Sequence, residues 1–469
     1  MAVSTDCSGE TGADADMCGI LPGAAGPGGP RAVCEIDRGT AECAPPTVPA
    51  RPHWRAWRQT SPSRPAEVLN TRFRIFWVGQ TLATFGTGFM IVALPLLVLE
   101  ATGSVAQMGL LTGTAGIVGI ATGFVAGSLV DRWDRRTLMI VCDLVRLMVF
   151  GSVPLVWLGG PQVWLLYVAV GIAAGFDMVF RVSYVAAVPG LVGREGVLAA
   201  NGRLETTNSL SLIVGPVLAG VVVAATGPTV AIAVNAAMFG ASALALSLIR
   251  FGPVADAPTV RGSVVAEFAA GFRFLWATPV LRWLTILLTV VSLLAVGMPD
   301  VLIFAVRVPL AGSESDVGLV LGIAGVGTVI SALLLPRLRR TLGFGPCWIG
   351  SFVLCAAAVA VLAFAGSVAV AAAVAPVFFF GLALAGISGM TLRQTITPDH
   401  LLGRVTAAFW TIHGSLGPIG AALLTAAVER FGVRGPLLVV CGLFALVSLV
   451  ALATPIRQRH PERAYAAVS

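Results

Sequence analysis

The 469-residue sequence contains no lysine, so all 30 of its basic residues are arginines. A nucleotide-binding loop of the type G-x-x-x-x-G-K-[ST] needs a lysine to contact the phosphates. The sequence has no such loop, and this excludes ATP hydrolysis by the chain itself. Any energy-requiring activity must therefore draw on an ion gradient or on a partner subunit.

Charged residues are also scarce. They make up 11% of the chain, whereas 57% of the residues are hydrophobic. A soluble domain carries about a quarter charged residues. Apolar runs of 20 or more residues recur along the sequence, and each is long enough to cross the hydrocarbon core of a bilayer as a helix. A soluble protein is excluded, and the sequence predicts an all-α integral membrane protein surrounded by lipid.

Cysteine and histidine are too few and too scattered for a metal site. Four of the eight cysteines precede residue 50, and the other four fall singly in or near apolar segments. No spacing fits a zinc site or a disulfide framework, so we expect no metal and no cofactor. The sequence has four histidines and no H-E-x-x-H motif, which argues against a membrane-embedded enzyme.

The apolar segments fall into two groups of six. Residues 1–72, rich in Gly, Pro, Ala and Arg, predict a disordered cytoplasmic tail. We expect a six-helix bundle at 73–249, a cytoplasmic linker with a short helix at 250–281, a second bundle at 282–455 and a cytoplasmic tail at 456–469. The helices are expected near 74–98, 105–130, 137–158, 163–187, 206–225, 229–249, 282–305, 316–336, 346–365, 368–391, 404–427 and 435–455.

The arginines fall almost entirely on one side of this arrangement. The two tails and the even-numbered connections contain 25 arginines, and the opposite side contains three. Because positively charged loops stay in the cytoplasm, both termini are predicted to be cytoplasmic, in the inner (cytoplasmic) membrane. The arginines are spread over short loops, so we expect no nucleic-acid partner.

The two groups of six resemble copies of one unit. Glycines recur every three or four residues in the second predicted helix (Gly109 to Gly127) and in the eighth (Gly318 to Gly325). Gly215-Pro216 in the fifth helix returns as Gly417-Pro418 in the eleventh. One such stripe indicates close helix packing. The repetition at an offset of about 200 residues indicates a parallel duplication whose stripes form the interface between two bundles.

The segment GSLVDRWDRR at 127–136 resembles the signature G-x-x-x-D-R-x-G-R-[KR] of the major facilitator superfamily, with Asp134 in place of the second glycine. Ala200-Asn201, Asn235, Glu267 with Gly271, Arg273 and Pro279, and the run from Arg393-Gln394 through Pro398-Asp399 to Gly403-Arg404-Val405 resemble its enterobactin-exporter and macrolide-efflux branch. The resemblance covers residues 72–455. It implies twelve transmembrane helices in two pseudo-symmetric six-helix bundles.

The resemblance also implies a gating role for the loop after the second helix. In the family this loop holds the two halves together in the outward-facing state, which assigns gating to Gly127, Asp131, Arg132, Arg135 and Arg136. Positive-inside orientation also accounts for these arginines. Asp399 and Arg404 occupy the equivalent region before the eleventh helix. Gly215, Pro216 and Pro418 are expected to bend their helices, because proline removes a backbone donor.

Four charged residues fall inside predicted spans: Asp143, Arg146, Asp177 and Arg181. A charge in the hydrocarbon core needs a partner or a purpose. Helix rise places Asp143 level with Arg181, and Arg146 level with Asp177. We expect two ion pairs between the third and fourth helices. The pairs either join the hairpin statically, or one carboxylate, Asp177 before Asp143, exchanges a proton.

Other polar or aromatic residues in apolar segments are candidates for lining a substrate cavity. They are Gln80, Thr84, Thr87, Asn235, Asp300, Trp410 and His413. His413 has a side chain that titrates near working pH, although a hydrogen-bonded packing histidine is the preferred interpretation. Few charges face the predicted cavity, which favours a hydrophobic or amphipathic small molecule.

The sequence thus predicts a monomeric secondary transporter, not an enzyme, that exports a drug, antibiotic, natural product or siderophore in exchange for protons. The fifth helix lacks the paired glycines of drug antiporters after Gly215-Pro216, so proton antiport follows from analogy. An importer of a small metabolite on the same fold is an alternative. A membrane-embedded enzyme or a channel is a remote one.

Overall fold

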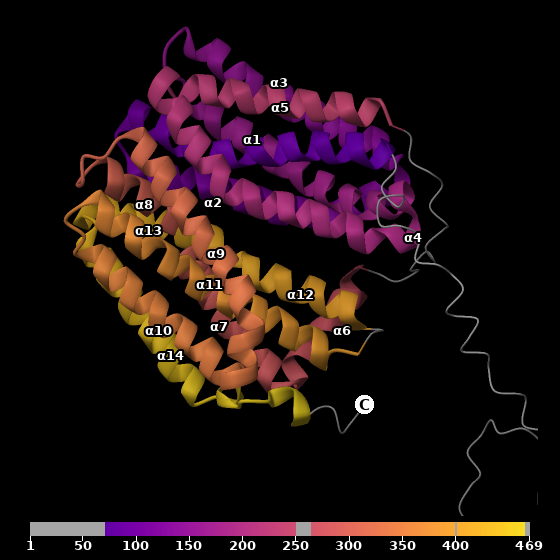
Figure 1. The fold of residues 1–469 in the computed structure, drawn as a ribbon, viewed down its shortest axis with the longest axis vertical. Helices are drawn as coiled ribbons and strands as arrows, with labels where there is room; N and C mark the ends of the chain where they lie inside the picture. The colour runs from indigo at the N-terminus through magenta and orange to yellow at the C-terminus, as the bar shows by residue number, and fades with distance from the viewer. Residues whose placement is uncertain (1–70, 250–263, 399–400, 465–469) are drawn as a thin grey trace, which may run out of the picture. The chain divides into compact units, whose positions relative to one another are not determined.

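The computed structural model of the protein describes residues 71–249, 264–398 and 401–464, which belong to the second of two compact units, 64–469. Every regular element in these ranges is a helix (Figure 1). The predicted tail 1–72 lies outside the described residues except for its last two positions. The helices are α1 (Thr71–Thr102), α2 (Val105–Arg132), α3 (Arg135–Trp157), α4 (Val163–Thr226), α5 (Pro228–Ser247), α6 (Val264–Ala277), α7 (Pro279–Ala295), α8 (Met298–Arg307), α9 (Glu314–Leu342), α10 (Phe344–Ala363), α11 (Val368–Ile396), α12 (Leu402–Ser415), α13 (Gly417–Phe431), α14 (Arg434–Leu452), η4 (Pro455–Arg457) and η5 (Pro461–Ala464).

Twelve helical segments of the described chain are long and apolar enough to cross a membrane. α7 with α8 forms one of them and α12 with α13 another, whereas α4 contains two, Val163–Gly193 and Ala199–Thr226. Helices satisfy their own backbone hydrogen bonds, as a polypeptide inside lipid must. The predicted all-α fold with twelve spans is confirmed. The short helix α6 lies within the predicted linker and packs against α12.

The predicted connection between the fourth and fifth spans is wrong in extent. The expected spans end at 187 and begin again at 206, but in α4 the helix continues on both sides of a kink at Gly193. Gly193 has φ 71°, a left-handed conformation that glycine adopts without steric cost. The glycines of this stretch indicated a loop. The Leu, Ala, Arg and Glu residues between them are strong helix formers and extend both spans.

The helices form two halves. The N-half consists of α1 to α5, in which α1 packs against α4 and α5, and α3 also packs against α5. The C-half consists of α7 to α14, in which α11 packs against α9 and α10, and α10 also packs against α14. Two helix pairs form the most extensive contacts between the halves, α2 with α13 and α4 with α9 (Figure 1).

Glycines allow these two pairs to approach closely. A Cβ added at Gly220 of α4 would lie 2.8 Å from the Cα of Gly318 in α9. In the other pair, a Cβ at Gly113 of α2 would lie 3.0 Å from the carbonyl oxygen of Pro418 in α13. Real Cβ atoms essentially never approach another atom to 2.8 Å, and a contact of 3.0 Å is tighter than nearly all of those observed, so Gly220 requires glycine and Gly113 favours it. The prediction that the glycine stripes lie between the bundles is confirmed for the α9 stripe and for Gly109, Gly113 and Gly116 of α2.

The contacts between the halves are concentrated at one end of the bundle. We call it the α1–α2 end, because residues 103–104 connect α1 to α2 there, and we call the opposite end the α2–α3 end. Gly109, Gly113 and Gly116 of α2 all meet α13. Gly119 and Gly127, further toward the α2–α3 end, have no atom within 4 Å of an added Cβ. The halves therefore touch at the α1–α2 end and diverge toward the other.

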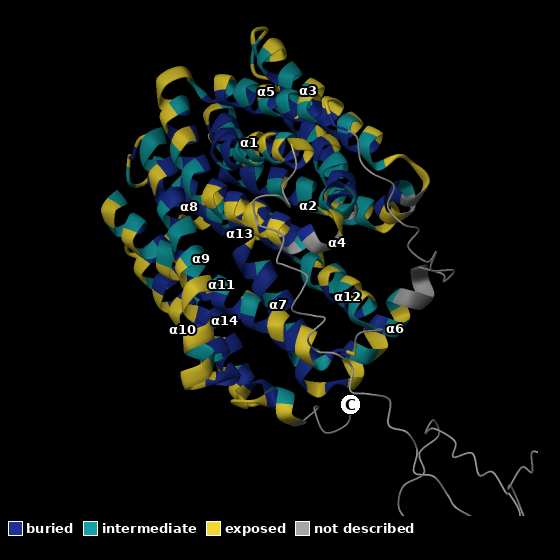
Figure 2. Cartoon of the chain, turned by 45° about the vertical axis from the view of Figure 1, so that its right-hand side comes forward, coloured by how far each residue is buried: buried dark blue, intermediate teal, exposed yellow. Residues whose placement is uncertain are grey.

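Large apolar side chains cover much of the outer surface, as Figure 2 shows by the exposed residues along the outward sides of the helices. Met148, Leu155, Leu333 and Leu423 are each more than 60% exposed. In water such a surface would drive aggregation. In a bilayer these side chains contact lipid, in agreement with a multi-pass membrane protein.

Candidate functional site

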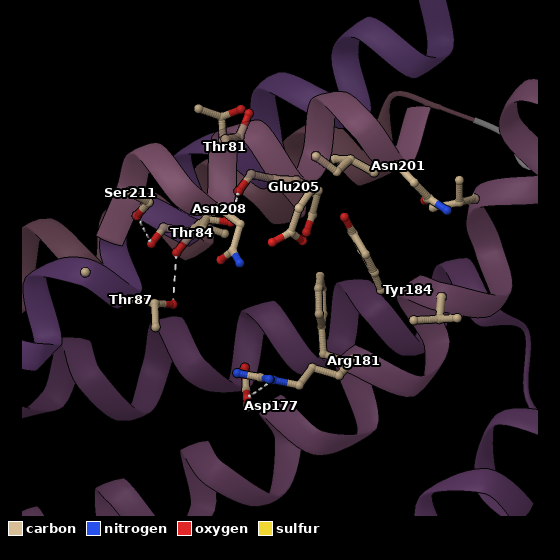
Figure 3. Close-up of a pocket in the computed structure, with 18 of the residues that line it drawn as sticks. Thr81, Thr84, Thr87, Asp177, Arg181, Tyr184, Asn201, Glu205, Asn208 and Ser211 are labelled. Atoms are coloured by element: carbon tan, nitrogen blue, oxygen red, sulfur yellow. Dashed lines mark hydrogen bonds and ion pairs between the residues drawn. The ribbon is translucent and has the colours of Figure 1, made fainter. Parts of the chain in front are cut away.

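A cavity of about 1010 Å³ lies in the N-half, among α1, α3, α4 and α5 (Figure 3). Three threonines of α1, Thr81, Thr84 and Thr87, lie on its wall at intervals of three or four residues, so they share one face of the helix. Thr84 and Thr87 donate their hydroxyls to their own helix, to the carbonyls of Gln80 and Ala83. The α1 wall is therefore polar without carrying charge.

The charges of this cavity come from a network between α3 and α4. Arg146 donates to Asp143 Oδ1 over 2.5 Å on its own helix and to Asp177 Oδ1 over 3.0 Å on α4. Arg181 donates to Asp177 Oδ2 over 2.8 Å, and Figure 3 shows this pair on one wall of the cavity. The four groups therefore form one chain of alternating charge.

The two ion pairs expected from helix rise are only half correct. The pair between Arg146 and Asp177 is present, but Asp143 pairs with Arg146 and not with Arg181. Arg181 lies one turn from Asp177 on the same helix, so it reaches that carboxylate without crossing to α3. Its side chain remains 71% exposed. Equal depth in the membrane therefore predicts an ion pair between two helices only where no oppositely charged residue lies nearby on the same helix.

Arg146 is the buried centre of this network. Its guanidinium lies 4.6 Å from the ring centroid of Phe180 and 4.3 Å from that of Phe239. Aromatic faces attract a cation at such distances. Arg146 is thus held by two rings and two carboxylates, while Asp177, with its side chain 36% exposed, connects the network to the cavity.

The cavity also contains a carboxylate that the sequence analysis missed. Glu205 and Asn208 of α4 point into it from the wall opposite Asp177 (Figure 3). The predicted fifth helix begins at 206, which leaves Glu205 in a loop. Asn201, Glu205 and Asn208 recur every three or four residues, a helical polar stripe. That period indicates a helix, but the glycine at 202 favoured a loop there.

The predicted cavity residues separate into three groups. Gln80, Thr84 and Thr87 line the cavity of the N-half. Asn235 is fully buried on α5, where its side-chain oxygen faces Gly86 of α1. Asp300 is 4% exposed at the interface of the halves and accepts a hydrogen bond from Thr112. Neither Asn235 nor Asp300 lines the cavity of the N-half, and their assignment to a substrate cavity stays a prediction.

Trp410 and His413 line a different cavity, of about 410 Å³, in the C-half among α7, α11 and α12. The His413 ring stacks on Phe409, with the ring centroids 5.3 Å apart, and meets Trp410 edge-on. Arg393 lies on the same wall. From the sequence, Arg393 was recognisable only as part of a family pattern and not as a site residue.

The loop at 127–136, to which the family resemblance assigns gating, lies at the α2–α3 end. Arg136 donates to the carbonyls of Leu246 and Ser247 at the end of α5, over 3.0 and 2.5 Å. Arginine at a helix C-terminus pairs with its unsatisfied carbonyls and its dipole. Arg136 therefore joins elements of one half in this conformation. The Asp131 side chain and residue Asp399 lie outside the described residues.

Asp134, which replaces the glycine of the signature, starts α3. Its φ of −60° is accessible to any residue, so the position needs no glycine. The backbone amide and the hydroxyl of Thr137 both donate to Asp134 Oδ2, over 2.8 and 2.7 Å. These bonds hold the pKa of the Asp134 carboxyl below its usual value of 3.8. The turn is stabilised by a helix cap instead of by backbone freedom.

The matched prolines act differently in the two halves. Helix α4 continues through Gly215 and Pro216, whereas α12 ends at Ser415 and α13 begins at Gly417, with Pro418 in its first turn. Of the two sites, only the one before Pro418 interrupts a helix, and the bends expected at both prolines stay a prediction. Proline is readily accommodated in a first helical turn, where its missing N–H has no intrahelical partner. Arg404, in the first turn of α12, has its backbone packed against Gly271 of α6.

The sequence is similar to known efflux proteins over most of its length. It is 28% identical over 380 residues to the multidrug efflux pump Tap of Mycolicibacterium fortuitum, covering 79% of this chain and 92% of that protein. It is 30% identical over 398 residues to Tap of Mycobacterium tuberculosis, covering 80% and 88%. It is 29% identical over 403 residues to the enterobactin exporter EntS of Salmonella typhimurium, covering 80% and 92%.

Solved structures agree with the fold. The nucleoside transporter NupG aligns with a TM-score of 0.67 at 13% identity, over 82% of this chain and 99% of that one. A bacterial homologue of the iron transporter ferroportin, in an inward-facing state, aligns with a TM-score of 0.61 at 18% identity, over 81% and 98%. The sequence profile of the Major Facilitator Superfamily matches residues 76–422. The chain belongs to the Major Facilitator Superfamily and is a multi-pass membrane transporter of small molecules, not an enzyme.

Proposed function

We propose that the protein is a proton-coupled exporter of hydrophobic or amphipathic small molecules that works by alternating access. The observation that carries the proposal is the network of Asp143, Arg146 and Asp177 beside the large cavity of the N-half. The curated relatives with export in their names support the direction of transport. The arginine distribution supports cytoplasmic termini and a cavity that opens toward the cytoplasm in this conformation.

Asp177 is the proposed site of proton exchange. Its carboxylate binds Arg146, which also binds the fully buried Asp143. It also binds Arg181, which lines the cavity. Two carboxylates on one buried cation form a coupled pair, in which protonation of one strengthens the bond of the other to the arginine. Because Asp177 is the more exposed of the two, it takes up or releases the proton, and Asp143 keeps Arg146 in place.

Alternating access requires the two helix pairs between the halves to open and close. α2 with α13 and α4 with α9 meet along glycines at the α1–α2 end, and α2 presents Gly119 and Gly127 without contacts toward the other end. In the opposite state we expect those two glycines to become the close contacts. Different glycines of α2 then form the close contacts in the two states.

The test uses everted membrane vesicles, in which an exporter fills the lumen. Three fluorescent probes cover the charge types: ethidium as cation, Nile red as neutral molecule and 8-anilinonaphthalene-1-sulfonate as anion. We expect an acid-inside pH gradient to drive uptake of at least one probe, an uncoupler to abolish it, and Asp177→Asn to abolish it with protein still in the membrane. Glu462→Gln, a carboxylate in η5 outside both cavities, is the matched control and should transport normally.

Two results would contradict the proposal. Wild-type uptake that is the same with and without the uncoupler would contradict proton coupling. Uptake by Asp177→Asn at the wild-type rate would end the role of that carboxylate, and Asp143→Asn would then be the next variant to measure.

A further inference from the structure

The cavity of the C-half differs from that of the N-half in its chemistry. Its walls from α7 and α11 are mostly aliphatic, with Ser292 and Arg393 as their polar members, and its α12 wall is aromatic, with Phe409, Trp410 and His413 in mutual contact. Trp410 is 52% exposed, so an indole is presented to any molecule that enters. A volume of about 410 Å³ lies within the range of small-molecule sites. The cavity is suited to an apolar body.

One full positive charge lies in this apolar wall. Arg393, near the end of α11, is 1% exposed, and none of its three guanidinium nitrogens has a hydrogen-bond partner among the described residues. Its guanidinium lies 3.8 Å from the ring centroid of Phe409 and 6.0 Å from that of Trp410. The side chain is thus held by aromatic faces, and its N–H donors remain unused.

A buried guanidinium in this condition is unusual. Arginine cannot lose its proton in a protein, so burial without an anion leaves a full charge in a medium of low dielectric constant. The other buried arginine of the transmembrane region, Arg146, has two carboxylate partners. Aromatic faces offset part of the cost at Arg393, but they leave the in-plane donors without acceptors. A visiting anionic group would supply those acceptors.

We propose that the C-half cavity binds organic anions with an apolar or aromatic body, and that Arg393 binds their anionic group. The body packs against Trp410 and the aliphatic wall, and a carboxylate, phenolate or sulfonate accepts from the guanidinium, which presents paired donors to such a group. This inference names the substrate class of the proposed exporter, and its relevance to transport rests on the proposed function. The two halves then have different roles, because the N-half exchanges protons and the C-half selects the substrate.

The experiment measures binding at equilibrium with full-length protein in lipid nanodiscs, without any gradient. The probes are 1-naphthylacetate, 1-naphthylacetamide with the same ring and no charge, and acetate with the charge and no ring. Quenching of tryptophan fluorescence reports binding, and Trp410→Phe identifies the share of the signal that arises beside the cavity. We expect naphthylacetate to bind at least about tenfold more tightly than the amide, which corresponds to about 1.4 kcal/mol.

The variants test Arg393 directly. Arg393→Gln keeps a polar side chain without charge and should bring the affinities for naphthylacetate and the amide to within about twofold of each other, a loss of most of a tenfold preference. Arg393→Lys keeps the charge and should keep a preference for the anion. Acetate should compete weakly, because it lacks the apolar body.

Several outcomes would overturn the inference. Equal affinity of the wild type for the two naphthyl probes would do so, and so would an anion preference that survives in Arg393→Gln. Acetate competing as well as naphthylacetate would reduce the site to one for simple anions. If size-exclusion chromatography finds Arg393→Gln misfolded, the wild-type preference and the loss of quenching in Trp410→Phe decide the matter, since neither needs that variant.

These results separate the inference from the proposed function. An anion preference in nanodiscs combined with no pH-driven uptake of any probe would end the proposed function and leave the binding site intact. Uptake of the cationic or neutral probe driven by pH, without an anion preference in binding, would end this inference alone.

Discussion

The hydroxyl of Thr112 on α2 donates to Asp300 Oδ2 on α8 over 2.8 Å, and this bond joins the two halves of the transporter through a buried carboxylate. A second contact lies near the start of α2. Glu429 of α13 accepts from the hydroxyl of Ser104 over 2.5 Å and from the backbone amide of Ala106 over 2.8 Å. A carboxylate from the C-half thus caps a helix of the N-half, where free N–H groups favour negative charge.

The Glu429 cap should stabilise closure of the α1–α2 end. We expect Glu429→Ala to increase the fraction of molecules open at that end, because the cap and its charge are lost together. Spin labels on Leu158→Cys and Phe431→Cys, one in each half and both exposed, report the opening by double electron–electron resonance in a cysteine-free background.

The control for this experiment is Asp316→Asn. Asp316 lies at the same end and accepts hydrogen bonds from Ser313, a residue of its own half, so its side chain should not affect the distance between the labels. An unchanged distance distribution in Glu429→Ala would show that the cap contributes nothing to closure.

The contact of Gly220 with Gly318 should not tolerate a side chain. A Cβ at Gly220 would lie 2.8 Å from both the carbonyl oxygen of Glu314 and the Cα of Gly318. Overpacking costs about 1–3 kcal/mol, so Gly220→Val should lower the population of this conformation about tenfold or more. The same labels measure it, and transport should fall with it.

Gly442→Val is the control for Gly220→Val. It lies on α14, where an added Cβ meets nothing within 4 Å. The closed population should remain as in the wild type. If Gly220→Val also left it unchanged, the packing of α4 on α9 would not be what holds this end closed.

Removal of Arg146 should be costly because it leaves Asp143 without its cation. The Asp143 side chain is 0% exposed, and that of Arg146 is 5% exposed. Breaking a buried pair by removing one partner costs about 3–5 kcal/mol. We therefore expect Arg146→Met to lower the free energy of unfolding by about that amount, and the double variant with Asp143→Leu to recover a large part of it. Thermal unfolding in detergent gives the ranking.

Arg181→Gln provides the comparison for Arg146. It removes an arginine that also binds Asp177, but its side chain is 71% exposed. Exposed ion pairs contribute about 0–1 kcal/mol, so this variant should unfold close to the wild type. A double variant no more stable than Arg146→Met would show that the cost arises from lost packing on Phe180 and Phe239 and not from the unpaired carboxylate.

The cap at Asp134 should contribute a pH-dependent stability. Asp134→Ala removes the acceptor for Thr137 and should cost about 1 kcal/mol. The folded pKa of Asp134 lies below 3.8. The contribution is therefore fully present above that value and is lost as the pH falls through the folded pKa. The difference in melting temperature between wild type and variant should be constant at neutral pH and shrink in acid; a difference that grows in acid would contradict the assignment.

Much of the fold follows from local sequence. Twelve apolar runs give twelve spans, because length and composition alone decide whether a helix can cross lipid. The glycine stripes of α2 and α9 also marked the correct faces. The bend at Gly193 was not predictable in the same way, since a glycine in a polar stretch is compatible with a loop, a turn or a kinked helix.

The candidate site was less predictable. The pair of Arg146 and Asp177 was predictable, because helix rise places the two residues at the same depth on neighbouring helices. Depth alone did not predict that Asp143 binds Arg146, or that Thr112 binds Asp300 across the interface. Arg393 lies at the end of a predicted span, where an arginine ordinarily reaches the membrane surface. Only its packing against Phe409 shows that it points inward instead.

The sequence by itself determined that the chain has twelve apolar spans and no lysine for a nucleotide-binding loop, because both depend on composition along the chain. The tertiary structure decided which charges share partners and which end is closed. It also decided that one cavity carries a network of carboxylates and arginines, while in the other the Arg393 guanidinium has no hydrogen-bond partner among the described residues. Those features depend on contacts between helices far apart in sequence, and the energy of a contact depends on the distance between the groups in space and not on their separation along the chain.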